Sequence, residues 1–143
     1  MLDCSNNIRE CYMDILEGNV VYNGNIIKVY GQTPFNTPPN IYIMLGSITE
    51  VADNNNQLFI TDADIDINII AEQYRRPDLS VVDAISSLVL NLIIPFTGVL
   101  DVGDDDFQIF PLSRISSRYL PSENGDVYIS RKILTINNLI IQK

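Results

Sequence analysis

The residues best suited to do chemistry in this sequence are acidic. They occupy alternate positions of the stretch 58–71 and three consecutive positions after a glycine: Asp62, Asp64 and Asp66, and then Asp104, Asp105 and Asp106. Carboxylates grouped in this way could bind a hard cation or serve a metal-dependent nuclease. The sequence contains no histidine, which excludes Ser-His and Cys-His nucleophilic sites and metal sites built on histidine.

Neither acidic group fits a known cation-binding or phosphate-binding motif. In an EF-hand loop that begins at Asp62, Ile67 occupies the position of the required glycine and Gln73 that of the bidentate glutamate. Carboxylates two residues apart on a strand lie about 7 Å apart and repel by only about 0.6 kcal/mol in water, so an acidic face is stable without a metal. The sequence also has no glycine-rich phosphate loop. We therefore expect no metal, no cofactor and no enzymatic activity.

Charge and composition narrow the class of protein further. Eighteen acidic and nine basic residues give a formal net charge of -9, so nucleic acid should be repelled rather than held by its phosphates. No apolar run approaches the roughly 18 residues of a membrane span, and the first ten residues lack the pattern of a secretory signal. We expect a protein that works in solution inside a cell, without a membrane partner. A length of 143 residues suits a single domain, 1–143.

The acidic stretch 58–71 is the clearest strand in the sequence. From Asp62 onward one parity carries the carboxylates, and the other carries Ala63, Ile65, Ile67, Ile69 and Ala71. A period of two places these sets on opposite faces of a half-buried strand. The stretch 41–51 is predicted to be its antiparallel neighbour, because the Asn-rich segment 53–57 between them is typical of a turn.

Two amphipathic helices are predicted to cover the apolar face of the sheet. The first follows Asp3 and Ser5, both suitable N-caps, and ends at Gly18. The second begins at a capping box of Ser80 and Asp83. Its apolar side chains recur at helical spacing: Val81, Val82, Ile85, Leu88, Val89, Leu92 and Ile93. Burial of about six large side chains at roughly 1.5 to 3 kcal/mol each makes this helix the anchor of the sheet.

The two cysteines are predicted to be reduced and packed in the first helix. Cys4 and Cys11 lie seven residues apart, which is about 10 Å along a helix axis. A disulfide requires Cα atoms within roughly 7 Å, so the two thiols cannot be joined while both lie on this helix.

The remaining segments complete the prediction of an α+β fold, a mainly antiparallel sheet with two helices packed on one face. Segments 20–22 and 26–30 should form a hairpin around an Asn-Gly-Asn turn. The loop 31–40 contains three prolines and should stay outside the sheet. Segments 107–118 and 127–141 should form a terminal hairpin, with a bulge or burial on both faces near Arg131 and Lys132.

Basic residues gather on this terminal hairpin, namely Arg114, Arg118, Arg131 and Lys132. They are nearly half of the nine basic residues of an acidic chain, which suits a subunit that packs its basic edge against the acidic face of a copy of itself. Local ion pairs with Glu123 or Asp126 explain the same pattern equally well.

Several weak motifs follow one another along nearly the whole chain. They are an N-terminal helix, Lys28-Val29-Tyr30, the loop from Pro34 to Pro39, the entry Ile41-Tyr42-Ile43-Met44-Leu45-Gly46, the alternating strand 61–71, the helix 81–93 and the closing strand 128–136. In this order they resemble the tail terminator and tail-completion family of bacteriophages, which includes the minor tail protein of lambda-like phages.

The resemblance implies an α+β subunit that forms a ring, commonly of six copies, at the head-proximal end of the tail or in the neck. Such a protein belongs to the virion and is assembled in the host cytoplasm. Its expected partners are copies of itself, other phage neck, connector or tail proteins, and DNA that passes through the lumen without specific binding. The aspartates 62, 64, 66 and 104–106 would suit such a lumen, because phosphates are repelled by like charge.

Candidate contact residues follow from this interpretation. The four basic residues, together with Asp62, Asp64 and Asp66, are candidates for the contact between subunits. Two loops are candidates for contacts with other virion proteins, through Pro34, Phe35, Pro38 and Pro39 and through Asp104, Asp105 and Asp106 in the loop 97–106.

Two other classes of protein stay open at this point. A small acidic adaptor or inhibitor that mimics the charge of nucleic acid would bind a basic partner with a steep salt dependence. A magnesium-dependent nuclease could use the same aspartates, although no paired lysine or further motif supports it.

Overall fold

The computed structural model describes residues 3–34, 36–54, 59–74, 78–93, 103–120, 122–124 and 127–143, and the structural statements below refer to these residues. Helices and strands follow one another in the order α1 (Ser5–Leu16), β1 (Val21–Tyr22), β2 (Asn25–Ile26), β3 (Lys28–Tyr30), β4 (Ile41–Asn54), β5 (Phe59–Tyr74), α2 (Ser80–Ile93), β6 (Phe107–Tyr119), β7 (Ser122–Asn124) and β8 (Val127–Gln142).

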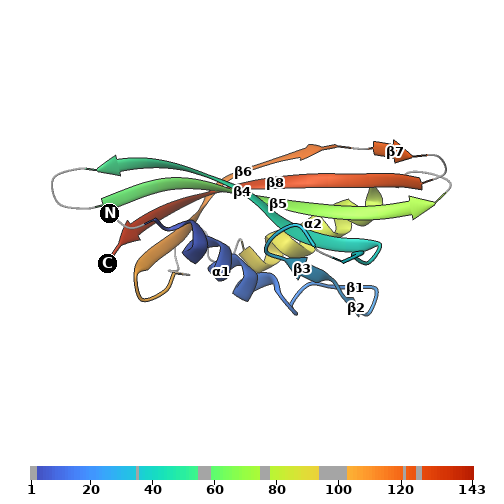
Figure 1. The fold of residues 1–143 in the computed structure, drawn as a ribbon, viewed down its shortest axis with the longest axis horizontal. Coiled ribbons are helices and arrows are strands. Elements are labelled where there is room, and N and C mark those ends of the chain that lie inside the picture. Colours follow the sequence, from blue (N-terminus) through green and yellow to red (C-terminus); the bar gives the residue numbers. More distant parts are fainter. Residues whose placement is uncertain are drawn as a thin grey trace.

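A long, twisted sheet forms one layer and the two helices form the other (Figure 1). The strand order is β3-β4-β5-β8-β6, with β7 paired to β8, and the pairs are antiparallel except for β3 with β4. Both helices lie on the same side of this sheet. The predicted fold class, α+β with a mainly antiparallel sheet and two helices on one face, is confirmed.

Strand β5 runs through the middle of the sheet and has the predicted two faces. Its aliphatic parity is fully buried against the helices: Ala63, Ile65, Ile67, Ile69 and Ala71 are each 0% exposed. Its carboxylate parity points to the opposite face, where Asp62 is exposed and Asp64 and Asp66 are half-buried. The alternation predicted for this strand is therefore confirmed.

A buried hydrogen-bond network ties α1 to the two central strands. Tyr12 on α1 is fully buried, and its hydroxyl donates to the side-chain oxygen of Asn138 on β8. The amide nitrogen of Asn138 donates to the carbonyls of Ala63 and Ile136, at 3.3 and 3.1 Å. Because the Asn138 amide is completely buried, it stabilises the fold only while its oxygen and nitrogen both have partners.

Helix α2 packs on the other half of the same sheet face. Four of its side chains are fully buried at i, i+3, i+4 spacing: Val82, Ile85, Val89 and Ile93. Cys4 and Cys11 are buried and form no disulfide, as predicted. Neither described helix is long and apolar enough to cross a membrane.

The N-terminal hairpin is shorter than predicted. Val21 pairs with Ile26, and the left-handed φ angles of Asn23 and Gly24, 50° and 79°, confirm the tight turn. The predicted strand 26–30 is wrong as one unit, because the N–H of Ile27 donates to the carbonyl of Val20 and closes the hairpin there. Residues 28–30 continue as β3, which joins the main sheet parallel to β4.

The predicted capping box of α2 is also wrong. The N–H of Ser80 donates to the carboxylate of Asp78 at 2.9 Å. The Asp83 carboxylate accepts hydrogen bonds from Lys132 and Tyr119, which lie outside the helix. At α1, likewise, the Asp3 carboxylate accepts the N–H of Ser5, and the N-cap position is Cys4. In both helices an aspartate before the first turn fixes the entry of the chain.

Strand β8 is regular, and the irregularity predicted near Arg131 lies in its neighbour. The register of β8 against β5 runs without a shift, whereas β6 shifts against β8 between Pro111 and Ile115. The imperfect alternation of β8 arises from burial on both faces, the second of the two predicted explanations. Ile133 is 4% exposed on the face away from the helices, and Leu134 is 1% exposed on the helix face.

The Tyr12–Asn138 bond predicts a specific loss of stability. In Tyr12→Phe the oxygen of Asn138 keeps no donor in a dry site, so the free energy of unfolding should fall by about 1–3 kcal/mol. Urea unfolding followed by circular dichroism measures the change. Tyr30→Phe, at a half-buried position of β3, is the matched control and should stay within about 0.5 kcal/mol of the wild type. Equal stability of both variants would contradict this role for Asn138.

Candidate functional site

The face of the sheet opposite the helices carries the aspartates of β5 as a row. Asp62, Asp64 and Asp66 stand beside residues of β8 that the register places on the same face. The amide nitrogen of Asn137, which is 3% exposed, donates to both Asp62 and Asp64, the latter at 2.7 Å. The hydroxyl of Thr135 donates to Asp66 at 2.7 Å. These three bonds come from neutral donors, which orient the carboxylates without carrying a balancing positive charge.

This arrangement favours an electrostatic surface over a metal centre. Among the residues that the structure describes, no three or more acidic or cysteine side chains are grouped closely enough to hold a metal ion. The bonds from β8 also occupy oxygens that a cation would need. What the row can do chemically is to attract a basic surface and to repel phosphates.

Two of the predicted basic residues lie on the same face as the aspartates. Arg118 on β6 is exposed and pairs with Ile133, and Arg131 on β8 is half-buried and pairs with Ile70. The β8 positions of these two arginines, Arg131 itself and Ile133 beside Arg118, lie nearer the N-terminal end of β8 than the β8 residues that pair with the aspartates. On this face the aspartates therefore lie toward one end of the strands, and Arg118 and Arg131 lie toward the other end, where Glu72 of β5 also lies. The side chain of Arg114, and the pairing alternatives Glu123 and Asp126, lie outside the described part.

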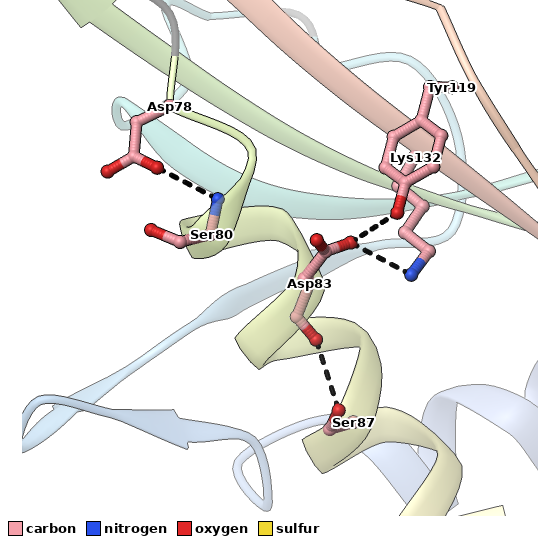
Figure 2. Close-up of polar contacts among 6 residues, drawn as sticks. All are labelled: Asp78, Ser80, Asp83, Ser87, Tyr119 and Lys132. Carbon is pink, nitrogen blue, oxygen red and sulfur yellow. Dashed lines mark hydrogen bonds and ion pairs between the residues drawn. The ribbon is translucent and has the colours of Figure 1, made fainter.

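Lys132 lies on the helix face, where its charge is used within its own chain. Its Nζ is 3.0 Å from Oδ1 of Asp83 on α2 and 5.2 Å from the ring centre of Tyr119, whose hydroxyl donates to the same carboxylate oxygen at 2.6 Å. Figure 2 shows this cluster together with the turn that begins α2. The bonds from Tyr119 and Lys132 lower the pKa of Asp83. Lys132 thus joins α2 to β8, and Tyr119 joins α2 to the end of β6.

In the second acidic run, 104–106, Asp104 forms hydrogen bonds within the fold and the other two aspartates are exposed. Asp104 accepts a hydrogen bond from Asn7 on α1 at 2.5 Å and the N–H groups of Asp106 and Phe107 at 2.9 and 3.0 Å. The Asn7 bond makes the largest contribution to lowering the pKa of Asp104. Asp105 and Asp106 are exposed and could meet a partner. Most of the predicted contact loop, residues 97–102, lies outside the described part.

The loop 31–40, which contains the prolines, borders three cavities. Pro34 and Pro38 are half-buried and Pro39 is exposed, while Phe35 lies outside the described residues. Pro34 lines a cavity of about 450 Å³, and Pro39 lines one of about 320 Å³ beside the β1–β2 hairpin. A larger cavity of about 760 Å³ lies where the loop meets Arg9 of α1 and Gly46 of β4.

Sequence reasoning missed Gly46 and the donors on β8. A Cβ at Gly46 would lie 2.6 Å from the amide nitrogen of Asn68, at the point where β4 shifts its register against β5. Glycine is therefore required by a close approach in the sheet. Thr135 and Asn137 could have been found, because they alternate with Leu134 and Ile136 in the sequence and so mark the polar face of β8.

Comparison of the sequence with protein families and with curated proteins gives no match. The fold is similar to that of a chain titled "Virion of native gene transfer agent (GTA) particle", with a TM-score of 0.69, 16% sequence identity and coverage of 100% of both chains. A second solved structure matches 96% of this chain and 94% of its own length, with a TM-score of 0.56 and 13% identity. At these identities the likeness establishes the fold.

The Asp83 cluster predicts a stability difference that depends on pH. Because the pKa of Asp83 is lowered in the folded protein, its contribution is complete above the unfolded pKa of about 3.9 and is lost as the pH falls through the folded value. The carboxylate is 46% exposed, so solvent screening limits the contribution to about 1 kcal/mol or less.

We therefore expect Asp83→Asn to lower the free energy of unfolding at pH 7, and the gap to the wild type to be smaller at pH 2.5, which lies below the unfolded pKa. Chemical unfolding at both pH values measures this gap. Asp14→Asn, at an exposed position of α1, is the control and should show no such dependence. A gap that is the same at both pH values would contradict the assigned charge interaction.

Proposed function

We propose that this chain is a structural subunit of a phage-like particle, and that copies of it form a ring at the junction of head and tail. The observation that carries the proposal is the likeness of the fold, over the whole length of both chains, to a chain of a gene transfer agent virion. The order of sequence motifs, which resembles the tail terminator and tail-completion family, supports a position at the junction of head and tail.

The charge of the uncovered sheet face supports a passage for DNA. In a ring whose helices point outward, the row of Asp62, Asp64 and Asp66 lines the central hole. The bonds from Asn137 and Thr135 hold these carboxylates in place, and repulsion between like charges lets a duplex slide past without binding. The neck, connector or tail proteins of the particle bind at the ends of the ring, through the proline loop and the exposed Asp105 and Asp106.

The proposal predicts a closed oligomer of defined mass. Native mass spectrometry and sedimentation of the purified protein over a range of concentrations should give one discrete species of several copies. A chain that stays monomeric at high concentration, even with its neighbouring virion proteins present, would contradict the ring. Tight binding to a basic nuclease by such a monomer would support the acidic mimic instead.

The acidic passage predicts a specific gain of DNA binding on charge reversal. Asp62→Lys should leave the oligomer intact but make it retain a DNA duplex, with an affinity that falls steeply with salt. Asp14→Lys makes the same change of charge at an exposed position of α1, on the helix layer, and should not retain DNA. Co-sedimentation with a short duplex measures both variants. If both variants retain DNA equally, or if neither does, the row of aspartates does not line the passage.

A further inference from the structure

The outer edge of β4 becomes open where β3 ends. β3 pairs with residues Tyr42 to Met44 only, so in the described part of the sheet no strand lies beside residues 45–54 on the side away from β5. The N–H of Glu72 on β5 donates to the carbonyl of Asn40, so the backbone groups of Glu72 point toward β4. In an antiparallel strand the direction of these groups alternates from residue to residue. The backbone groups of Asp64 and Asp62, which lie an even number of residues before Glu72, therefore also point toward β4.

This alternation identifies the outward-facing groups of β4. Thr49 and Val51 are the partners of Asp64 and Asp62, and their backbone groups point into the sheet. The N–H and C=O groups of Ile48 and Glu50, between them, therefore point outward, as do those of Ala52.

At the other side of the sheet, no strand among the described residues lies beside the last part of β6 on the side away from β8. The N–H of Leu120 donates to the carbonyl of Arg131 at 2.8 Å, so Arg118 and Ser116 direct their backbone groups toward β8. The backbone groups of Ile115, Ser117 and Tyr119 point outward. In Figure 1 the arrowhead of β4 lies at the left end of the long axis and that of β6 lies to the right of the centre, each on the upper border of the sheet.

The two edges differ in how they are protected from pairing. Natural sheets protect an open edge with proline, lysine, short strands or bulges. β6 carries Pro111 and a register shift before its open part, and Arg118 within it. Beyond its own register shift, β4 continues from Ile48 to Asn54 without proline, lysine or arginine, and Val51 is 63% exposed. The charged residues of this stretch are Glu50, which binds residues of the α1 entry, and Asp53, so β4 is less protected than β6 and can pair with another strand.

We propose that residues 48–52 of β4 pair antiparallel with residues 115–119 of β6 in a second copy of this chain, so that one sheet continues from subunit to subunit. This contact specifies how the proposed ring would be held together, and it therefore rests on the proposed function. Because it joins two different edges, it is head-to-tail and can close into a ring.

The side chains on the two edges agree with such a continuation. Glu50 lies on the helix face, where it accepts hydrogen bonds from Ser5 and Cys4 of α1. Tyr119 also lies on the helix face, where it binds Asp83 of α2. Residues paired across an antiparallel ladder place their side chains on one face. The helices of neighbouring copies therefore lie on one side of the continuous sheet, and the rows of aspartates lie on the other.

Charge supports one register of this pairing. If Glu50 pairs with Ser117 of the partner subunit, then Arg118 of the partner subunit stands opposite Thr49, whose neighbour on β5 is Asp64. The arginine side chain then extends over Thr49 toward the aspartates of β5, about two strand spacings away. Pairing of β4 with β4 of a second copy would instead bring two acidic regions together.

A disulfide test resolves this register directly. Thr49 and Arg118 would form a non-hydrogen-bonded pair with Cα atoms about 4.5 Å apart, a distance that suits a disulfide. Thr49→Cys protein mixed with Arg118→Cys protein should give a covalent dimer on a non-reducing gel. A chain with both substitutions should give a ladder of covalent oligomers. The native Cys4 and Cys11, at 2% and 7% exposed, are too buried to compete.

The register control is Thr49→Cys mixed with Ser116→Cys, whose diagonal separation of about 7 Å or more should reduce cross-linking at least tenfold. Strong cross-linking in this control, or in Thr49→Cys alone, would overturn the proposed register or the head-to-tail contact. Absence of all cross-links in a protein that native mass spectrometry shows to be a ring would overturn the edge contact and leave the proposed function standing. A protein that never forms an oligomer would overturn both.

A second pair of variants tests the backbone bonds. Ser117→Pro removes an outward N–H at an exposed edge position, where proline is tolerated, and should weaken self-association at least tenfold. Ser117→Val keeps that N–H and should change self-association less than threefold. The melting temperature of each variant, measured under dissociating conditions, shows whether it folds. Equal assembly of the two folded variants would overturn the contact.

Discussion

The structure depends on the strict two-residue alternation of β5. From Ala63 to Ala71 every second side chain of this strand is an aliphatic group that is fully buried under the helices, and a shift by one residue would bury the aspartates instead. That penalty fixes the register of β4 and β8 on either side of β5, and with it the positions of both helices. It also fixes a row of carboxylates on the opposite face, so the core and the candidate site are two consequences of one sequence pattern.

Much of the fold could be predicted because local signals and tertiary packing agree. Period-two and helical spacings located β4, β5, α1, α2 and the terminal hairpin, and the Asn-Gly turn located the first hairpin. Errors occurred where a polar side chain had a choice of partners. Asp83 fits a capping box in sequence, yet in the fold Tyr119 and Lys132 compete for it and Asp78 takes over the helix entry. Long-range partners of this kind leave no local signal.

The candidate site was also predictable only in part, because some of its residues depend on long-range partners. Alternation alone placed Asp62, Asp64 and Asp66 on one face, but the donors Asn137 and Thr135 depend on the pairing of β5 with β8. Charge counting grouped Lys132 with Arg118 and Arg131, although adjacent residues of a strand point to opposite faces. Lys132 consequently stabilises the contact of α2 with the sheet, while Arg118 and Arg131 share the face of the aspartates. Glycine is required at position 46 because a side chain there would collide with Asn68, a contact that the sequence does not indicate.

The row of aspartates on one face and the edges of β4 and β6 that no described strand covers support one account of assembly. Helices on one side supply the stability, and the other side is left to interact with charged partners. The central claim of this account is that the face with the aspartates becomes the inner wall of a ring. Cryo-electron microscopy of the purified oligomer tests it most directly. The account predicts a central hole lined by β5, with α1 and α2 on the outer surface. A ring whose hole is lined by the helices, or an oligomer without a hole, would contradict it.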